Sequence, residues 1–299
     1  MKQGASMKAD TKYTIILKLL TAIAHLPLSA LYHLSNFAYF VIYRLVRYRR
    51  DTVRSNLERV FGKDDKDRIL QLEKGFYRHF CDCFVETVKL LHISDKEVDE
   101  RVKVTNGEYI DGIIRSGHPV VLFLGHYGNW EWVQAIIRHF SEPLIGGQIY
   151  APLSDRVMDR VMLSIRSRFG LECIPQHKAV RRLIQIINDG QLFVIGFISD
   201  QRPGGAVLRH WTDFLGQDTP YATGGETIGN HVGADFVYLD VEKTSRGHYR
   251  MTFCPITPDP EDKEEFPYTR GFFKMLEKTI YRAPQYWLWS HKRWLRQRN

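Results

Sequence analysis

The sequence predicts an α/β fold in which a mixed, largely parallel sheet is flanked by helices and preceded by an N-terminal, membrane-associated helical segment. The sheet is indicated by short apolar runs of strand length that alternate with helical stretches of ten or more residues, as in parallel sheets built from strand–helix–strand units. The membrane segment is indicated by a long uncharged stretch near the N-terminus. With 299 residues, 44% of them hydrophobic, the chain can bury one large core.

Residues 1–60 are predicted to form a membrane anchor or a pair of interfacial helices. Residues 19–43 contain no Asp, Glu, Lys or Arg, and about 20 apolar residues suffice to cross a bilayer core. Pro27 and several polar side chains interrupt this stretch, so an interfacial or kinked helix pair is the alternative to a single crossing. The positive-inside rule places the rest of the chain on the cytoplasmic side. The arginines that support this orientation are Arg44, Arg47, Arg49, Arg50 and Arg54.

The formal charge of +8 is concentrated at the two ends of the chain, because the residues between 61 and 290 carry more Asp and Glu than Lys and Arg. No helix-turn-helix, zinc-finger or aromatic RNA-binding signature accompanies the basic ends, so nucleic acid is not an expected partner. The four cysteines form neither a disulfide framework nor a zinc-ligand spacing, which indicates reduced thiols in a cytosolic body and no metal site.

The patterning of apolar residues predicts the elements that follow. Helical spacing over residues 67–92 indicates one or two amphipathic helices. Buried strands are predicted at residues 119–125, 143–150, 171–175 and 191–200. Helices are predicted at residues 129–140, 154–169 and 178–188, the last of which ends in the stop sequence NDG.

The C-terminal part departs from this alternation. Residues 234–256 predict two strands joined by a TSRGH turn, and the acidic stretch DPEDKEE predicts a solvated loop. The sequence PYTRGFFKMLEKTIYRAP predicts a last helix, because its apolar residues recur at helical spacing. One face of that helix is expected to pack in the core: Phe272, Met275, Leu276, Thr279 and Ile280.

The stretch GHYGNWEW directly follows the apolar run PVVLFL. On an uninterrupted helix, His126 and Glu131 would lie about 140° apart around the axis. If the strand ends at Gly125 and Asn129 caps a helix that begins at Trp130, the first helical turn can return the Glu131 carboxylate to the imidazole. The pair would then lie at the carboxyl end of a parallel strand, where open α/β sheets form their ligand crevice.

A neutral imidazole held in one tautomer by a carboxylate is a general base for a hydroxyl or amine proton. No serine stands in a G-x-S-x-G nucleophile elbow, so no nucleophile for an acyl-enzyme intermediate is visible. The simplest chemistry is direct attack of an acceptor on a bound acyl thioester, with His126 as base and Glu131 orienting it. The alternative is that His126 is only hydrogen-bonded to a helix cap at the end of a strand.

The stretch GHYGNWE resembles the H-x4-D/E motif of glycerolipid-type acyltransferases, in the version found in the late acyltransferases of lipid A assembly and the related phosphatidylinositol-mannoside acyltransferases. Further blocks are similar in order and spacing. PLSDRVMDRVMLSIRSRFG resembles the block that ends in Arg-Phe-Gly, and FISDQRPGG resembles the Asp-Gln block. DFLGQDTPYATGGE resembles the following Phe-x-Gly segment and helix start, and APQYWLWSHKRW the terminal Pro-x-x-Trp-x-Trp-x-His-Arg-Arg signature. The resemblance covers essentially the whole chain.

The resemblance implies an acyltransferase domain over residues 61–299 with a glycerolipid-acyltransferase-like fold, attached to the bacterial inner membrane and facing the cytoplasm. It implies transfer of a fatty acyl chain from acyl carrier protein or coenzyme A to a hydroxyl or amine of a lipid acceptor, a lipid A precursor above all. It also implies His126 and Glu131 as the catalytic pair, and no cofactor beyond the acyl donor.

Four further residues are candidates for substrate binding. For Arg168 the resemblance suggests a place near the acceptor's phosphate or the reacting acyl group, which suits a guanidinium fork. Arg168 can equally be an ordinary cation at a helix C-terminus. Asp200 and Gln201 either shape the site or form a turn before RPGG. Asn129 is the fourth candidate, because it lies between His126 and the helix that Asn129 is expected to cap.

The sequence also leaves alternative acceptors and functions open. Lipid A enzymes often carry a further acidic residue after Asp-Gln, whereas Arg202 stands here, so a lysophospholipid or an aminoacyl lipid is an alternative acceptor. A metal-dependent hydrolase could use His126 and Glu131 with Asp200, His210 or His231 as ligands, although no H-E-x-x-H spacing is present. A third alternative is a catalytically inert membrane scaffold on the same fold.

Overall fold

The computed structural model describes residues 2–204, 208–261 and 263–295. Within these residues, seven strands form one sheet in the order β1-β9-β8-β2-β5-β3-β4. Neighbouring strands are parallel except β8 and β9, which are antiparallel. The strands of this sheet are β1 (Val102–Thr105), β2 (Val120–Leu124), β3 (Ile145–Tyr150), β4 (Glu172–Pro175), β5 (Phe193–Ile198), β8 (Asp235–Ser245) and β9 (His248–Pro255). A separate antiparallel pair consists of β6 (Trp211–Phe214) and β7 (Gln217–Pro220).

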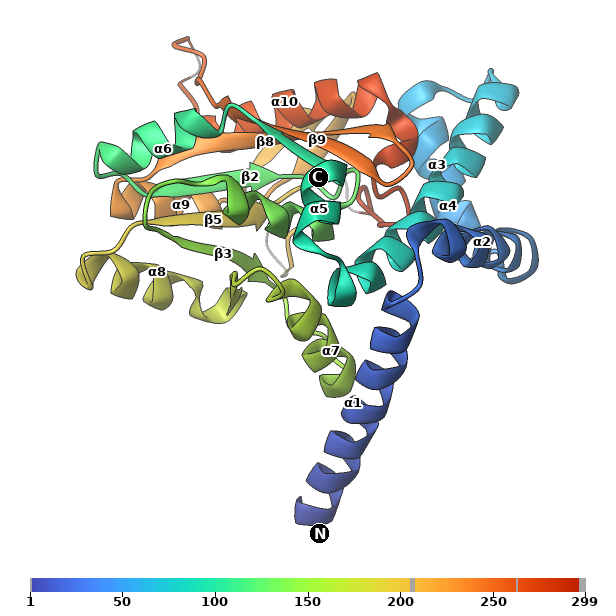
Figure 1. Ribbon diagram of the computed structural model, residues 1–299. Helices are drawn as coiled ribbons and strands as arrows, with labels where there is room; N and C mark the ends of the chain where they lie inside the picture. Colours follow the sequence, from blue (N-terminus) through green and yellow to red (C-terminus); the bar gives the residue numbers. More distant parts are fainter. Residues whose placement is uncertain (1, 205–207, 262, 296–299) are drawn as a thin grey trace.

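Helices surround the sheet and extend from it on the N-terminal side (Figure 1). The α-helices are α1 (Lys2–Ala24), α2 (Leu28–Tyr39), α3 (Arg50–Phe61), α4 (Lys66–Lys89), α5 (Asp95–Arg101), α6 (Gly107–Arg115), α7 (Arg156–Arg166), α8 (Ala179–Asn188), α9 (Gly224–Val232) and α10 (Pro267–Arg282). The other helical segments are the π-helix η1 (Phe40–Val46) and the 3₁₀ segments η2 (Leu90–His92), η3 (Trp130–His139), η4 (Gln176–Lys178) and η5 (Pro284–Tyr286).

The two faces of the sheet are covered by different helices. Phe123 of β2 points to the face that carries α9 and α10, where its ring stacks on Phe272 with centroids 5.3 Å apart. Gly225 of α9 approaches the same ring so closely that an added Cβ would lie 2.8 Å from it. Leu122 and Leu124 point to the opposite face, which η3 covers. The strand β2 is therefore buried on both sides, which explains its uninterrupted apolar sequence.

Most predicted elements are confirmed, and the four predicted strands correspond to β2, β3, β4 and β5. The predicted two strands of residues 234–256 correspond to β8 and β9, and the predicted last helix corresponds to α10. Residues 129–140 were predicted as a helix, and η3 is an unusually long 3₁₀ helix of ten residues. The sequence does not predict the strands β1, β6 and β7, each of which contains only four residues.

The N-terminal segment forms two helices separated by a sharp bend. Within the described residues, no single helix is long and apolar enough to cross a membrane. The pair formed by residues 9–24 and 28–46 meets that test only together, and its two parts are bent by 115°. The helix α1 projects from the body (Figure 1) and is held to α7, where Tyr13 Oη and Ser164 Oγ are 2.9 Å apart. The bend occurs at Pro27, the residue that interrupts the apolar stretch.

Candidate active site

His126 and Asp200 meet because the strands that precede them are in register. Leu124 of β2 pairs with Ile198 of the parallel strand β5, and each of the two site residues lies two positions beyond its strand partner. His126 Nδ1 is 2.6 Å from Asp200 Oδ1, and the His126 backbone N–H donates to Oδ2 over 3.0 Å. Two hydrogen bonds to one carboxylate therefore fix both the backbone and the ring of His126.

The Asp200 carboxylate is buried and accepts a third hydrogen bond, from the indole N–H of Trp287 at 2.7 Å. Burial alone would raise the pKa of Asp200, but the adjacent His126 ring and the N–H donors lower the pKa below its ordinary value. An ionised carboxylate can only accept, so Nδ1 of His126 carries the proton and Nε2 is the basic nitrogen. Among the described residues, Nε2 has no hydrogen-bond partner. Its lone pair is therefore available to a substrate.

Glu131 does not hold the imidazole, which corrects the expected pairing of His126 with Glu131. The Glu131 carboxylate instead receives both arms of Arg166 from α7, at 2.9 Å from Nε and 2.5 Å from Nη2. The Glu131 side chain is 9% exposed and that of Arg166 is 20% exposed. The first turn of η3 is formed as expected, but it directs Glu131 toward α7, where a planar guanidinium offers two donors. Glu131 thus joins η3 to α7 and does not pair with His126. The pair formed by His126 and Asp200 is called the dyad below.

Asn129 forms the predicted cap of the helix that begins at Trp130. Its Oδ1 accepts the backbone N–H of Glu131 at 3.2 Å, and its Nδ2 donates to Glu86 of α4 at 2.8 Å. Gly128 allows the preceding turn because its φ is +62°, and an added Cβ would lie 2.9 Å from Val241. The Gly128 carbonyl in turn accepts the ring N–H of His79 at 3.0 Å. The turn formed by residues 126–129, here called the motif turn, is therefore fixed by hydrogen bonds to side chains of α4.

The other two sequence candidates contribute less to this geometry. Arg168 lies just beyond α7, where its Nη2 donates to the Ile93 carbonyl at 3.3 Å and is 3.9 Å from an Asp95 oxygen. These contacts are with the segment that follows α4 and not with the dyad. Gln201 follows Asp200 and is partly buried, and within the described part of the chain its side chain has no hydrogen-bond partner. The structure thus brings together His126, Asn129 and Asp200 of the six candidates.

The C-terminal segment supplies residues that were not singled out from the sequence. The Nε2 atom of His291 accepts the backbone N–H of Arg202 at 3.2 Å. Burial, and next the charge of Arg293, lower the pKa of His291 to about 4. Arg293 is 1% exposed and donates to the Pro220 carbonyl at 2.6 Å. Its Nε and Nη1 have no partner among the described residues, and burial lowers its pKa to about 10. The terminal sequence APQYWLWSHKRW could have indicated these residues, because it contains Trp287, His291 and Arg293.

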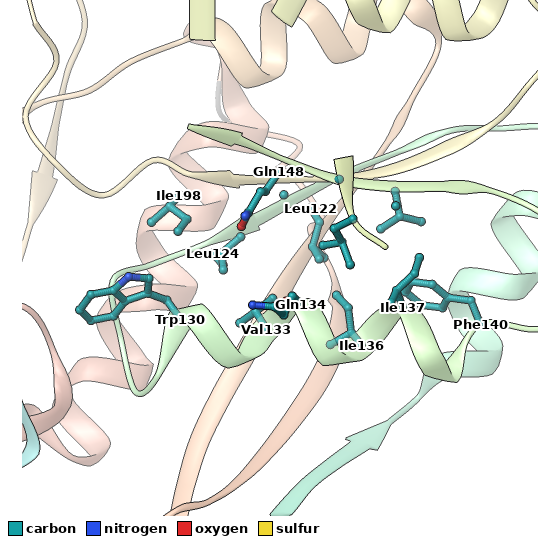
Figure 2. A pocket seen from close by; sticks show the side chains of 15 residues that line it. Leu122, Leu124, Trp130, Val133, Gln134, Ile136, Ile137, Phe140, Gln148 and Ile198 are labelled. Atoms are coloured by element: carbon teal, nitrogen blue, oxygen red, sulfur yellow. The ribbon is translucent and has the colours of Figure 1, made fainter. Parts of the chain in front are cut away.

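An apolar pocket lies between η3 and the sheet (Figure 2). Trp130 lines this pocket and also meets the His126 ring edge-on, with centroids 5.2 Å apart. Figure 2 shows Leu122 and Leu124 facing Val133 across the pocket. The volume open to the centre of a water molecule is about 30 Å³, room for one or two waters. A long apolar ligand therefore needs η3 or its side chains to move outward.

No metal site accompanies the dyad in the part of the chain that the structure describes, where no group of three or more His, Cys, Asp or Glu side chains is arranged to hold an ion. No curated protein matches the chain. A family model does match, described as bacterial lipid A biosynthesis acyltransferase, over residues 3–296. This match covers the dyad, the pocket and nearly all of the chain beyond them, so the protein belongs to the bacterial lipid A biosynthesis acyltransferase family and is an acyltransferase.

Proposed function

We propose that the enzyme moves a fatty acyl chain from an acyl thioester, of acyl carrier protein or coenzyme A, to a hydroxyl or amine of a lipid A precursor at the membrane surface. The family supports acyl transfer in lipid A synthesis. The observation that carries the mechanism is the His126–Asp200 pair, whose short 2.6 Å contact leaves Nε2 facing away from the carboxylate. A base of this kind activates an acceptor and needs no covalent intermediate.

In the proposed reaction, His126 Nε2 removes the proton from the acceptor hydroxyl as its oxygen attacks the thioester carbonyl. The new C–O bond forms, the C–S bond breaks, and the imidazolium returns its proton to the departing thiolate. Asp200 stabilises the imidazolium and keeps the proton of the resting ring on Nδ1. Glu131 has a positioning role, because its ion pair with Arg166 ties the start of η3 to α7.

We propose that the pocket beneath η3 receives the acyl chain. Its apolar lining suits a hydrocarbon, and Trp130 brings its entrance to the His126 ring. Gly196 of β5 lies on the pocket face of the sheet, where an added Cβ would meet Leu124 only at the ordinary distance of 3.5 Å. Side chains at position 196 would therefore enter the pocket without displacing the fold. The 3₁₀ geometry of η3, with its poorer hydrogen bonds, allows the helix to shift when a tail enters.

We infer that the N-terminal helices attach the enzyme to the cytoplasmic face of the inner membrane. Large apolar side chains of α1, α2 and η1 are exposed, and Arg44 and Arg47 lie beside them. Apolar side chains enter the headgroup boundary, and each arginine near an anionic leaflet adds about 1 kcal/mol of attraction. The bend of 115° suits helices that lie in the interface. The exposed apolar side chains are Ile15, Leu19, Leu26, Leu34, Phe37, Phe40, Leu45 and Val46.

The test is lipid mass spectrometry of cells with and without the protein, combined with purified variants. Loss of one acyl chain from lipid A identifies the acceptor and the chain length together. A lysophospholipid or aminoacyl lipid lacking a chain would identify the alternative acceptors instead. Activity is expected to persist in EDTA, whereas a metal-dependent hydrolase would lose it.

Purified His126→Ala is expected to lose transfer by about 10²–10⁴-fold, the usual contribution of a general base. Asp200→Asn is expected to lose at least about 100-fold, because an amide does not hold the same tautomer. The matched control is Asp99→Asn, which removes a surface carboxylate paired with Arg138 and should leave the rate unchanged. Full activity in purified His126→Ala would exclude His126 as the general base.

A further inference from the structure

The pocket beneath η3 is apolar except for two amide side chains. Its helical wall is formed by two rows of side chains three residues apart, and Gln134 lies in the same row as Ile137. On the sheet wall, Gln148 of β3 lines the pocket beside Gly196 of β5, its partner in register. Figure 2 shows Gln148 pointing from the sheet toward η3, and Gln134 lying along η3. A pocket for a plain hydrocarbon gains nothing from amides in these places.

Gln134 carries an oxygen that has no partner. The residue is 2% exposed, and its Nε2 donates to the Glu131 carbonyl at 2.9 Å. Its Oε1 is buried and makes no hydrogen bond among the described residues. Exchanging the oxygen and nitrogen of the amide would set Oε1 against the Glu131 carbonyl, acceptor against acceptor. The hydrogen bond of Nε2 therefore fixes the orientation of the amide and leaves Oε1 as the unpaired acceptor of this pocket-lining residue.

An unpaired, buried amide oxygen is unfavourable, because it has lost its hydration without gaining a donor. The large majority of buried side-chain polar atoms in proteins have a partner. No donor among the described residues reaches this oxygen, and the other side-chain amide of the lining, Gln148, donates to Cys173 Sγ at 3.4 Å. The partner must then come from the occupant of the pocket, and Oε1 requires a donor rather than an acceptor.

We propose that the acyl chain this pocket selects carries a hydroxyl group, which donates a hydrogen bond to Gln134 Oε1. The proposal rests on the proposed function and adds the class of acyl donor to it. Gln134 lies four residues beyond Trp130, or about 8 Å along a 3₁₀ helix with a rise of about 2 Å per residue. The hydroxyl is therefore expected several carbons beyond the thioester carbonyl. A chain without it would bury the oxygen of Gln134 unpaired.

The experiment measures binding of free fatty acids to the full-length His126→Ala protein, which needs no turnover. Dodecanoate is compared with dodecanoates that bear one hydroxyl near the carboxylate or in the middle of the chain. The mid-chain hydroxy acid is expected to bind about tenfold more tightly than dodecanoate, the effect of one satisfied acceptor in an apolar site. In His126→Ala/Gln134→Leu, this ratio is expected to fall to about one, because leucine presents no acceptor.

The controls separate the role of Oε1 from general effects on the pocket. Gln134→Met repeats the loss of the acceptor with an unbranched side chain, should the leucine variant fold poorly. Gln148→Leu removes the other amide and is expected to leave the ratio unchanged. Equal binding of the two acids to the parent would overturn the proposal, and would mean that a water occupies the Gln134 oxygen. A preference that survives in both Gln134 variants would overturn it as well.

Failure of the proposed function gives a different result. If neither hydroxylated nor plain acyl thioesters support transfer by the unmodified enzyme, the proposed reaction is wrong whatever the binding ratio. If both thioesters are transferred at equal rates and both acids bind equally, the reaction stands and the preference for a hydroxylated chain is rejected.

Discussion

At the scale of single residues, the site depends on how each carboxylate is paired. Asp200 is surrounded by donors, so its charge is directed at the His126 ring. Glu131 is neutralised by a bidentate guanidinium from Arg166, which leaves little of its charge for the imidazole. Asp200 and Glu131 thus have different roles, because one carboxylate contacts His126 and the other contacts Arg166.

Removal of the Glu131 charge is expected to affect stability first. Glu131→Gln leaves the largely buried Arg166 without its ion-pair partner, and breaking a buried pair costs about 3–5 kcal/mol, with the partly exposed guanidinium placing this case at the lower end. Urea unfolding would measure the loss. The double variant Glu131→Gln/Arg166→Met is expected to recover much of it, because no charge then lies unpaired. Unchanged stability of Glu131→Gln with abolished transfer would instead assign Glu131 to the chemistry.

His291 gives a second prediction, for the dependence of stability on pH. Its pKa is about 4 in the folded protein against an ordinary 6.5, because of burial and the neighbouring charge of Arg293. Between these values the unfolded chain binds a proton that the folded protein does not. The free energy of unfolding is therefore expected to fall as the pH is lowered from about 6.5 to about 4. His291→Gln, which keeps an acceptor for the Arg202 N–H, should show a flatter curve in urea unfolding. Identical slopes in both proteins would contradict this.

At the scale of elements, α4 holds the turn on which His126 lies. Glu86 of α4 is fully buried and accepts hydrogen bonds from Tyr32 at 2.8 Å, Asn129 at 2.8 Å and Tyr249 at 2.7 Å. These donors come from α2, from the motif turn and from β9. A single carboxylate therefore joins the N-terminal helices to the turn of residues 126–129 and to the sheet.

Glu86→Ala is expected to lower the free energy of unfolding by at least about 3 kcal/mol, because each buried donor left without a partner costs about 1–3 kcal/mol. Hydrogen exchange should speed up first in residues 126–132, whose cap at Asn129 loses its anchor. Glu108→Ala on α6 is a suitable control, since that side chain is not fully buried. A stable Glu86→Ala protein with unchanged exchange would show that the turn does not depend on α4.

At the scale of the whole molecule, most of the exposed large apolar side chains belong to the N-terminal helices, and fewer belong to the rest of the described chain. Phe37 and Phe40 are 64% and 53% exposed, although the fold offers large cores elsewhere. Exposed apolar groups of this number on one segment are typical of an interaction surface. The proposed surface is the membrane, which would place the entrance of the site close to its lipid acceptor.

The double variant Phe37→Glu/Phe40→Glu is expected to bind anionic vesicles more weakly by tenfold or more, because two aromatic side chains leave the bilayer boundary and two charges are added. Cosedimentation with vesicles measures this binding, and its salt dependence reports the arginine contribution. The exchange of Phe84, an exposed aromatic of α4, by glutamate is the comparison. An equal loss of vesicle binding in the double variant and in Phe84→Glu would show that the effect is not specific to the N-terminal helices.

The sequence by itself determined the order of the main elements and the sheet class, and it predicts His126 as the base of the proposed reaction. These features depend on residues that are close together in the sequence. Periodicity over a few residues predicts strands and helices, and the H-x4-E spacing indicates the turn after β2. The cap at Asn129 could also be predicted, because a cap depends only on its neighbours in the chain. The resemblance of the ordered blocks to the lipid A acyltransferases was likewise readable from the sequence, and the family match confirms it.

Only the tertiary structure decided which carboxylate holds the imidazole. Asp200 is 74 positions from His126 and meets it through the register of β2 with β5. Arg166 is 35 positions from Glu131 and takes that carboxylate away from the ring. Such pairings depend on how strands align and how helices pack, and neither is encoded in the spacing of residues along a single segment. The nearest acid in sequence was therefore the wrong partner, and the acid brought close by the sheet is the one that contacts His126.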